Sequence, residues 1–478
     1  MMKNRENTRL ILVSNRLPIV LKKIANEEYQ VQSASGGLVT AMTPILKRDG
    51  GLWIGWAGNY SEESVEVEKL LKKEAEKLNY EYRSVDITLN EYKLYYKGFS
   101  NEVLWPLFHN VSVFCNFVPK YYEAFKKVNK KFAKTVIDEL IDGDFIWVHD
   151  YHLINMAKEL REEGIKNRVV FFLHIPFPPV ETFNRLPWRL EIVEAMLSYD
   201  LIGFQTALDK KNFLEAVVSL IKRAVIEDEK LEISKITIDK KEHQVGVFPI
   251  SIDYDEFHDR AKSKRVSKEV EKIKKEYHHQ KIMLGVDRLD YSKGILQKLR
   301  AYWKLLDENH DLHKKVKLIQ IIVPSRENII KYIHLKSDIE QLVSEINGEF
   351  TQPGWIPIQY CYYSLNNTEL LAYYRASDIA MVTPLRDGMN LVAKEYCATN
   401  INKNGVLILS EFAGTKDQFK DNALLVNPFD ENSVVEAIKK ALLMDEKEKQ
   451  RRMKNMQKIV KEFDIYWWVD RFLKASKI

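Results

Sequence analysis

The sequence has no long hydrophobic run. Its N-terminal apolar stretch, Leu10–Val13, is only four residues long, which is too short for the core of a signal peptide. No uninterrupted apolar stretch elsewhere reaches the length of a membrane span. The three cysteines, Cys115, Cys361 and Cys397, stand far apart without a CxxC pair, a pattern that favours reduced thiols over a disulfide framework. These absences predict a cytoplasmic protein without a membrane partner.

The chain also lacks a charge of one sign and several common functional motifs. Its net charge of +5 is small against 73 basic and 68 acidic side chains, which argues against a nucleic-acid partner. There is no Walker loop, dinucleotide GxGxxG or GxSxG elbow, and no cluster with the spacing of metal ligands. Asp142-Gly-Asp144 resembles the DxD metal motif of some sugar transferases, but it precedes a predicted strand, so a surface turn is favoured. We therefore expect no metal and no cofactor.

What the sequence does contain is a regular alternation of short apolar runs with helical patterns, over a length of 478 residues that suggests two domains. Runs that are apolar on both faces and separated by helices predict an α/β fold with parallel sheets. The predicted strands are Arg9–Val13, Leu52–Trp56, Phe145–Val148, Val169–His174, Leu201–Phe204, Gln244–Pro249, Ile282–Val286, Val316–Val323, Ile379–Val382 and Val406–Leu409. The predicted helices include Tyr121–Leu140, Leu190–Ser198, Asn212–Arg223, Arg326–Ile346 and Ser433–Met444.

The favoured domain boundary lies near Pro249–Asp253, where a strand ends and a polar, charged segment follows. Two Rossmann-like halves, residues 1–250 and 251–478, would place a cleft between them, with ligands at the carboxyl ends of the strands. The aromatic segment Phe463–Phe472 predicts a final helix that packs back on the N-terminal half.

The segment Gly285–Gly294 (GVDRLDYSKG) is the strongest functional signal. It follows an apolar strand, precedes a helical pattern, and carries Arg288 and Lys293 on either side of Asp290. Two cations and a helix N-terminus at the end of a strand are typical of a phosphate site. A solvated basic loop is the alternative.

A second loop of this kind is Pro384–Glu395, after the strand Ile379–Val382. Gly388 permits a tight turn, and the next amides would open a helix that can hold an anion. Glu395 could reach a ribose diol, although considered alone it is better explained as an exposed helix carboxylate. His149–His152 and His174 also follow strands, where imidazoles suit sugar hydroxyls or proton transfer, while buried structural histidines are the alternative. Ser35–Leu38 (SGGL) alone is weak evidence for more than a turn.

Together these motifs resemble the trehalose-6-phosphate synthases, retaining sugar transferases of glycosyltransferase family 20 with the two-Rossmann GT-B fold. The resemblance runs from SNRLP at Ser14 to NPFD at Asn427, through SGGL, the YYKGFSNEVLWPLFH stretch, WVHDYHL, FFLHIPFPP, GFQT, GVDRLDYSKG, PSR, TPLRDGMNLVAKEY and SEFAGT. It implies an α/β architecture in which the two parallel sheets face a central cleft.

The resemblance also assigns roles to individual residues. It implies that Arg288 and Lys293 hold the nucleotide diphosphate, and that Asp150 contacts the acceptor. The full donor-binding set is Gly37, His174, Arg288, Lys293, Asp387, Asn390, Leu391, Val392 and Glu395. The acceptor-binding set is Arg16, Tyr96, Trp105, Asp150 and Arg326, and the catalytic set is Asp150, His174, Arg288, Lys293 and Asp387.

The implied reaction transfers glucose from a nucleoside-diphosphate glucose, with UDP-glucose as the expected donor, to glucose 6-phosphate with retention. A relative with another acceptor, such as a glucosylglycerol-phosphate synthase, and a silent regulatory subunit are the rival readings. The residues leave open whether the base is uracil, guanine or adenine, whether the chain forms a homo-oligomer, and how the loop Leu17–Ser35 is ordered. A separate phosphatase is expected to release trehalose.

Overall fold

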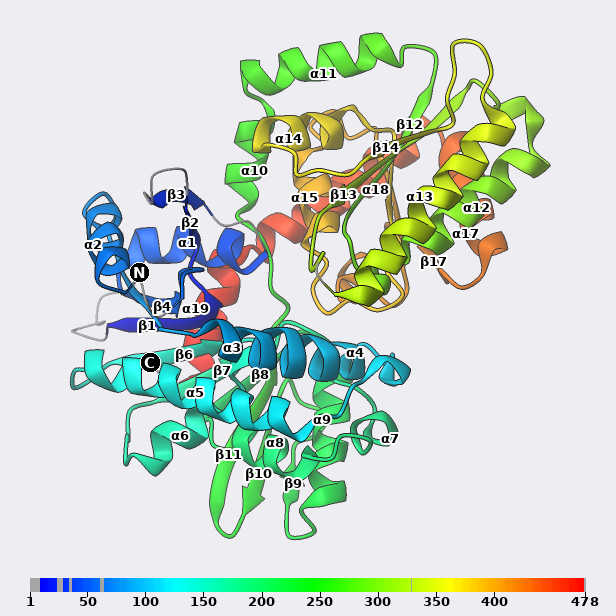
Figure 1. Ribbon diagram of the computed structural model, residues 1–478. Helices are drawn as coiled ribbons and strands as arrows, with labels where there is room; N and C mark the ends of the chain where they lie inside the picture. The colour runs from blue at the N-terminus through cyan, green and yellow to red at the C-terminus, as the bar shows by residue number, and fades with distance from the viewer. Residues whose placement is uncertain (1–8, 24–28, 34–36, 61–63, 328, 477–478) are drawn as a thin grey trace. The chain divides into compact units, whose positions relative to one another are not determined.

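The computed structural model describes residues 9–23, 29–33, 37–60, 64–327 and 329–476. It divides into two compact units, the first formed by residues 1–250 with 468–478 and the second by residues 251–467. Figure 1 labels many of the elements of both units. In the described part of the chain, no helix is both long enough and apolar enough to cross a membrane. The three cysteines are free.

The first unit is built on a nine-stranded sheet of order β5-β4-β1-β6-β7-β8-β11-β10-β9. Its strands from β5 to β11 pair in parallel, because apolar runs such as Ile11–Val13 are buried on both faces and need helices to cover them. The strands of this sheet are β1 Leu10–Arg16, β4 Leu52–Trp56, β5 Glu81–Ser84, β6 Phe145–His149, β7 Val169–Phe172, β8 Leu201–Phe204, β9 Val225–Glu227, β10 Ile233–Ile238 and β11 Lys241–Val247. A separate two-stranded sheet is formed by β2 Ile19–Lys23 and β3 Tyr29–Ser33.

The helices that cover this sheet include one long α-helix of 21 residues, α5, and a π-helix of 13 residues, η2. They are α1 Gly37–Asp49, α2 Ser64–Ala75, α3 Leu89–Glu91, η2 Tyr92–Leu104, α4 Trp105–Phe108, η3 Ser112–Phe114, α5 Pro119–Glu139, η4 Tyr151–Leu153, α6 Met156–Glu162, α7 Val180–Phe183, α8 Arg189–Met196, α9 Ala207–Leu220 and the final helix α19 Ile465–Ala475.

The second unit contains a six-stranded parallel sheet of order β14-β13-β12-β15-β16-β17. Its strands are β12 Lys281–Arg288, β13 Val316–Val323, β14 Ile358–Cys361, β15 Ile379–Val382, β16 Val406–Ser410 and β17 Leu424–Val426. Its helices are α10 Tyr254–Ala261, α11 Lys264–Glu276, η5 Tyr291–Lys293, α12 Ile295–Glu308, η6 His310–Leu312, α13 Ile330–Phe350, α14 Asn367–Ala376, α15 Leu391–Thr399, α16 Lys416–Phe419, α17 Glu431–Leu443 and α18 Glu446–Glu462.

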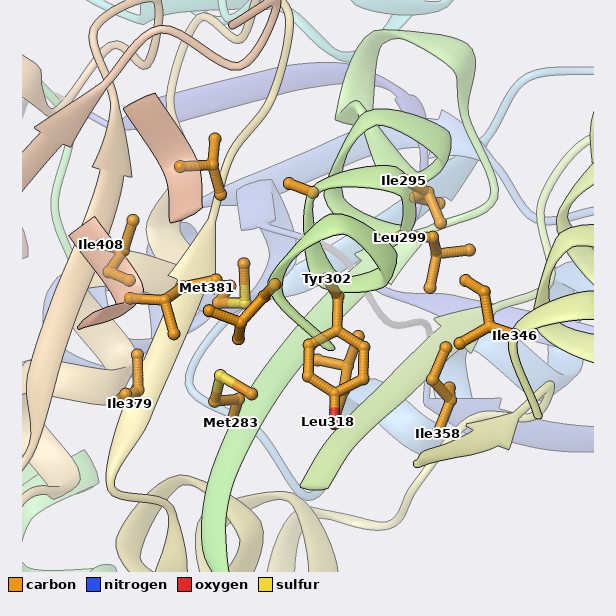
Figure 2. Close-up of a cluster of buried hydrophobic side chains, with 14 of the residues drawn as sticks. Met283, Ile295, Leu299, Tyr302, Leu318, Ile346, Ile358, Ile379, Met381 and Ile408 are labelled. Atoms are coloured by element: carbon orange, nitrogen blue, oxygen red, sulfur yellow. The ribbon is translucent and has the colours of Figure 1, made fainter. Parts of the chain in front are cut away.

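One face of this second sheet carries the core shown in Figure 2, where α12, α13 and α17 cover the strands. Leu299 and Tyr302 of α12 lie over Met283 and Leu318 of the sheet and are fully buried. The α12 apolar positions recur every three to four residues, which is the spacing that places them on one side of a helix. The core holds the strand ends in fixed register, and those ends carry the candidate site.

Several of the predicted elements differ from the structure. The sequence left the order of Leu17–Ser35 open, and the structure forms an antiparallel pair of strands there, β2 with β3. The first sheet is not wholly parallel, since β9 and β10 pair antiparallel at its edge. The helix predicted from Arg326 begins only at Ile330. The strands predicted to reach His174 and Pro249 end at Phe172 and Val247.

Candidate active site

The two large sheets each have one point where the strand order reverses. Several of the predicted site residues end or follow the strands at these points, among them Arg16, Asp150, Lys293 and Asp387. In the second unit β12 lies between β13 and β15, so the chain winds outward in both directions from the β12–β15 pair. In the first unit the corresponding neighbours are β1 and β6. Loops that leave the carboxyl ends of such neighbouring strands diverge, and the crevice between them is where open α/β sheets bind ligands.

The loop after β12 is held close to the loop after β15. Gly294, which precedes α12, has a φ of 65°, and a Cβ there would lie 2.4 Å from the carbonyl oxygen of Thr383. Only glycine fits both conditions. The amide of Leu385 donates to the carbonyl of Ser292 at 2.8 Å, so the two loops are joined through their backbones.

Lys293 lies at the junction of these loops. Its Nζ is 2.6 Å from Oδ2 of Asp387, and the side-chain Nδ2 of Asn390 donates to the same oxygen at 3.0 Å. Asn390 adopts a left-handed conformation with a φ of 56°, and its Oδ1 caps α15 by accepting from the Ala393 amide at 3.3 Å. A cation and the N-terminus of a helix therefore lie together, which is a favourable place for a phosphate.

Arg288 ends β12 with an exposed side chain, whereas Arg326 is held by Asp290 of the loop that follows β12. The Arg326 Nη1 donates to Oδ2 of Asp290 at 2.6 Å and to the Tyr332 hydroxyl at 2.8 Å. Asp290 also accepts from the Ser292 amide at 2.9 Å. Because Asp290 is buried and bound from both sides, it fixes the loop and the arginine in one arrangement.

Glu395, one turn into α15, is not an exposed helix carboxylate. It is half-buried, and its Oε2 accepts from the Tyr374 hydroxyl at 2.9 Å. Burial raises the pKa of Glu395, and the hydrogen bond from Tyr374 lowers it. Burial holds the pKa of Tyr374 well above its usual value, so its hydroxyl remains the donor.

A buried ion pair lies beneath this loop. Lys298 of α12 donates to Oδ2 of Asp287 at 2.6 Å, and Gln320 donates to the same oxygen at 3.0 Å. The side chain of Lys298 is fully buried. A Cβ at Gly285 would lie 2.3 Å from the Gln320 side chain, so this glycine makes room for the pair next to the strand.

In the first unit, Arg16 ends β1 among aromatic rings. Its guanidinium carbon is 4.8 Å from the centre of the Trp56 ring and 5.5 Å from that of Tyr96. Tyr96 in turn stacks on His152 at 5.6 Å and on Tyr92 at 5.2 Å. Cation–π contacts of this kind orient the guanidinium, and its planar fork of N–H groups can then bind two oxygens of an anion such as phosphate.

The remaining first-unit candidates are more enclosed. Trp105 begins α4, is buried, and lies 4.2 Å from the ring of His109. Asp150 follows β6 with a φ of 74°, and its amide donates to the Phe172 carbonyl at 2.8 Å. Such a conformation is uncommon for a residue with a side chain and is often found at functional sites. Gly37 is the first residue of α1, while Ser35 and Gly36 lie outside the described residues.

His174 follows β7 with its ring buried next to His149. His149 Nδ1 and His174 Nε2 are 3.0 Å apart. Burial lowers the pKa of His174 to about 3, so the imidazole is neutral at physiological pH and can exchange hydrogen bonds with a hydroxyl group without carrying charge.

Asp142 and Gly143 form the predicted turn, and Asp142 is exposed. Asp144 is buried rather than at the surface, and it forms an ion pair with Arg9 at 2.7 Å. Among the described residues, no group of three or more His, Cys, Asp or Glu side chains could hold a metal ion.

The sequence had not singled out several groups that the structure places around the candidates. They are Trp56 and Tyr92 near Arg16, Tyr332 near Arg326, Tyr374 near Glu395, and Lys298 near Asp287. Each is distant in sequence or lies within an ordinary amphipathic pattern, so no local signal marks it. Knowledge of the tertiary packing within each unit, such as the approach of α14 to α15, would have been needed to find them.

The chain is similar over nearly its whole length to characterised proteins. The family described as Glycosyltransferase family 20 matches residues 8–477. An "Alpha,alpha-trehalose-phosphate synthase [UDP-forming]" of Candida albicans is 38% identical over 472 residues, which cover 98% of this chain and 96% of that protein. A "Bifunctional trehalose-6-phosphate synthase/phosphatase" of Thermoproteus tenax is 38% identical over 477 residues, and the match spans 97% of this chain but only 63% of that protein.

Solved structures agree with these sequence matches. A trehalose-phosphate synthase (UDP-forming) of Burkholderia xenovorans in complex with glucose-6-phosphate superposes with a TM-score of 0.88 at 35% identity, covering 98% of this chain and 100% of that one. An E. coli protein bound with UDP-2-fluoro glucose gives a TM-score of 0.88 at 35% identity, covering 98% and 99%.

Proposed function

Because the chain belongs to glycosyltransferase family 20 and has the GT-B type of α/β fold, we propose that it is a retaining trehalose-6-phosphate synthase. It transfers glucose from UDP-glucose to the anomeric hydroxyl of glucose 6-phosphate and releases UDP and α,α-trehalose 6-phosphate. The relatives named above support both substrates. One observation within the chain itself carries the proposal. Lys293, Asp387 and the N-terminus of α15 lie together at the point where the strand order of the second sheet reverses.

The second unit binds the nucleotide sugar in this proposal. Arg288 and Lys293 bind the diphosphate, together with the amides of Asn390, Leu391 and Val392. Asp387 exchanges its Lys293 contact for a hydroxyl of the donor glucose, and Glu395 accepts from the ribose hydroxyls. The described geometry supports this because Lys293 and the capped end of α15 lie next to one another.

The first unit supplies most of the other contacts in this proposal. Arg16 binds the phosphate of glucose 6-phosphate, with Tyr96 beside it, and Trp105 and Asp150 contact the acceptor sugar. His174 and Gly37 belong to the donor-binding set. Arg326 of the second unit is also an acceptor-binding residue. The support is that Arg16 is already oriented by the rings of Trp56 and Tyr96.

The transfer of glucose depends on stabilising the charge of the departing diphosphate. The bond between the anomeric carbon and the diphosphate oxygen breaks, and the acceptor oxygen bonds to the same face of that carbon. The departing phosphate accepts the proton of the acceptor hydroxyl, so no protein nucleophile is needed. Arg288 and Lys293 stabilise the negative charge that develops on the diphosphate, and the sugar contacts align the two reactants.

The proposal requires no metal and no other cofactor. It places the enzyme in the cytoplasm, as its widely spaced, free cysteines predict. A separate phosphatase would then convert the product to trehalose. Activity should survive thorough treatment with EDTA, and loss of activity that manganese or magnesium restores would reveal a metal site.

The deciding experiment uses the purified protein with glucose 6-phosphate and a panel of UDP-, GDP- and ADP-glucose. We expect trehalose 6-phosphate and UDP in equal amounts, with the other nucleotide sugars less effective and free glucose a very poor acceptor. Arg326→Ala should raise the KM for glucose 6-phosphate much more than the KM for UDP-glucose. If glycerol 3-phosphate serves as well as glucose 6-phosphate, the acceptor assignment is wrong.

A further inference from the structure

We infer that His149 is a positioning residue, which donates a hydrogen bond from Nδ1 to Nε2 of His174 and thereby fixes His174 as the tautomer with its proton on Nδ1. His174 then presents a ring N–H to a hydroxyl oxygen of the donor glucose. This inference rests on the proposed function, because that function assigns His174 to the donor sugar.

The contact is built into two neighbouring strands. His149 is the last residue of β6 and is paired in register with Phe172 of β7, two residues before His174. The Nδ1 to Nε2 distance is 3.0 Å. His149 is fully buried and His174 is 3% exposed, so water cannot readily replace either ring as the partner of the other.

The surroundings of the pair are apolar and aromatic. The ring of Trp147 lies 4.9 Å from that of His149, and the ring of Phe172 meets His174 edge-on at 4.7 Å. Helix α19 completes this wall, because Phe472 stacks on Trp147 at 4.4 Å. Within the described part of the chain, Nε2 of His149 is buried and has no hydrogen-bond partner.

The direction of the hydrogen bond follows from these observations. Burial lowers the pKa of His174 to about 3 and that of His149 well below its usual range, so both rings are neutral and only one of the facing nitrogens carries a proton. If His174 were the donor, the proton of His149 would have to lie on Nε2, as a buried N–H without an acceptor. Orphaned buried N–H groups are rarer than orphaned acceptors. His149 is therefore the donor.

The variants His149→Asn, His149→Gln and His149→Leu separate positioning from packing. The side-chain nitrogen of asparagine can occupy nearly the place of Nδ1, whereas glutamine extends its amide towards Nε2. We expect His149→Asn to keep turnover within a few-fold of the wild type. His149→Gln and His149→Leu should lower kcat about 10- to 100-fold, as loss of the partner that orients a functional histidine does elsewhere, with a smaller change in the KM for glucose 6-phosphate.

A matched control is His243→Leu. His243 is a buried histidine of β11 in the same unit, outside the candidate site, and its substitution should leave kcat unchanged. Thermal unfolding of every variant shows whether the fold is kept. His174→Ala identifies the nuclear magnetic resonance signals of His174 in protein labelled with ¹⁵N-histidine, and these signals report the tautomer in the wild type directly.

The outcomes are distinct. The inference is supported if the proton of His174 lies on Nδ1 and if His149→Asn keeps the turnover that His149→Leu loses. A proton on Nε2 of His174 overturns it, even where the leucine variant does not fold, and so does wild-type turnover of a folded His149→Leu variant. If His174→Ala itself transfers glucose normally, the assignment of His174 in the proposed function fails; if only the His149 variants are normal, that assignment stands and the inference fails.

Discussion

Lys293 and Asp387 show how two side chains set the charge where the loops after β12 and β15 meet. Their side chains are 13% and 11% exposed and lie 2.6 Å apart, so each charge is screened little by water. In the proposed function Lys293 stabilises the leaving diphosphate, so we expect Lys293→Ala to lower kcat by about two orders of magnitude or more, as for other preorganised groups that stabilise developing charge. Steady-state kinetics with UDP-glucose and glucose 6-phosphate measure the effect.

The control for this substitution is Lys304→Ala. Lys304 lies on the following helix, α12, and pairs with Glu308 at 2.6 Å, so its loss removes the same charge from the same unit. Turnover of this variant should remain that of the wild type. Equal kinetics for both lysine variants, with folding intact, would exclude Lys293 from the donor site.

Tyr374 controls the ionisation of Glu395. Its hydroxyl donates to the carboxylate at 2.9 Å, which lowers a pKa that burial raises. Tyr374→Phe should therefore raise the pKa of Glu395. In the proposed function the ionised carboxylate accepts from the ribose hydroxyls, so donor affinity should fall as the pH drops through this pKa, and in the variant the fall should begin at a higher pH.

The KM for UDP-glucose, measured across pH for both proteins, tests this shift. Tyr302→Phe is the matched control, since Tyr302 is also buried in the second unit and its hydroxyl donates to the Pro357 carbonyl at 3.1 Å. The control should keep the wild-type profile. Superimposable profiles for Tyr374→Phe and the wild type would show that the hydroxyl does not tune the carboxylate.

The residue scale also shows what the sequence could predict. Lys293, Asp387 and Asn390 were predicted from two loops 94 residues apart, because each loop follows an apolar strand and opens a helix; the structure brings them together. Tyr374 was not predicted, because it lies inside an ordinary helix and its role depends on the approach of α14 to α15. Local pattern therefore locates the residues at strand ends, whereas their supporting partners depend on tertiary packing.

Among the elements, the π-helix η2 is unusual, since 13 residues is long for a form that mostly occurs as single turns at functional sites. It carries Tyr96 and leads into Trp105. Gly98 lets it pack on α5, because a Cβ there would lie 2.7 Å from the ring of Tyr121. Gly98→Ala should destabilise the protein by about 1–3 kcal/mol, the usual cost of overpacking, in denaturant unfolding.

Gly348→Ala is the control for the Gly98→Ala substitution. Gly348 lies within α13 and a Cβ there would meet no atom within 4 Å, so the substitution should be neutral or stabilising by about 0.4–1 kcal/mol. The double variant Gly98→Ala, Tyr121→Ala should recover part of the stability lost in Gly98→Ala, because the clash is then removed. Absence of any such coupling would locate the strain elsewhere.

The elements that sequence predicted best are those with a complete apolar run. β4, β8 and β15 have the predicted bounds, since buried parallel strands are apolar on both faces. β2, β3, β9 and β10 were missed because they carry alternating polar residues or are short. The register that pairs them is set by contacts between strands, which a single sequence does not display.

At the scale of the whole molecule, the chain ends inside the unit in which it begins. Residues 468–478 belong to the first unit, and Trp468 donates from Nε1 to the Phe248 carbonyl at 2.9 Å. The unusual aromatic content of this segment had predicted a docked helix. Its rings complete the wall around His149, so the last helix contributes to a site formed by residues more than 290 positions earlier in the chain.

Phe472 allows this docking to be measured. Its ring is fully buried, stacks on Trp147 at an interplanar angle of 11°, and fills the space that a side chain at Gly203 would occupy, where a Cβ would lie 2.5 Å away. Phe472→Ala should destabilise the first unit by about 3–5 kcal/mol, because it creates a large cavity. Hydrogen exchange should then accelerate in β6 and β8 but not in the sheet of the second unit.

The control is Phe429→Ala, at a position that is 63% exposed. It removes the same ring without creating a cavity, so hydrogen exchange in β6 and β8 should stay unchanged. Equal protection of β6 and β8 in the two variants would mean that α19 does not stabilise the first unit.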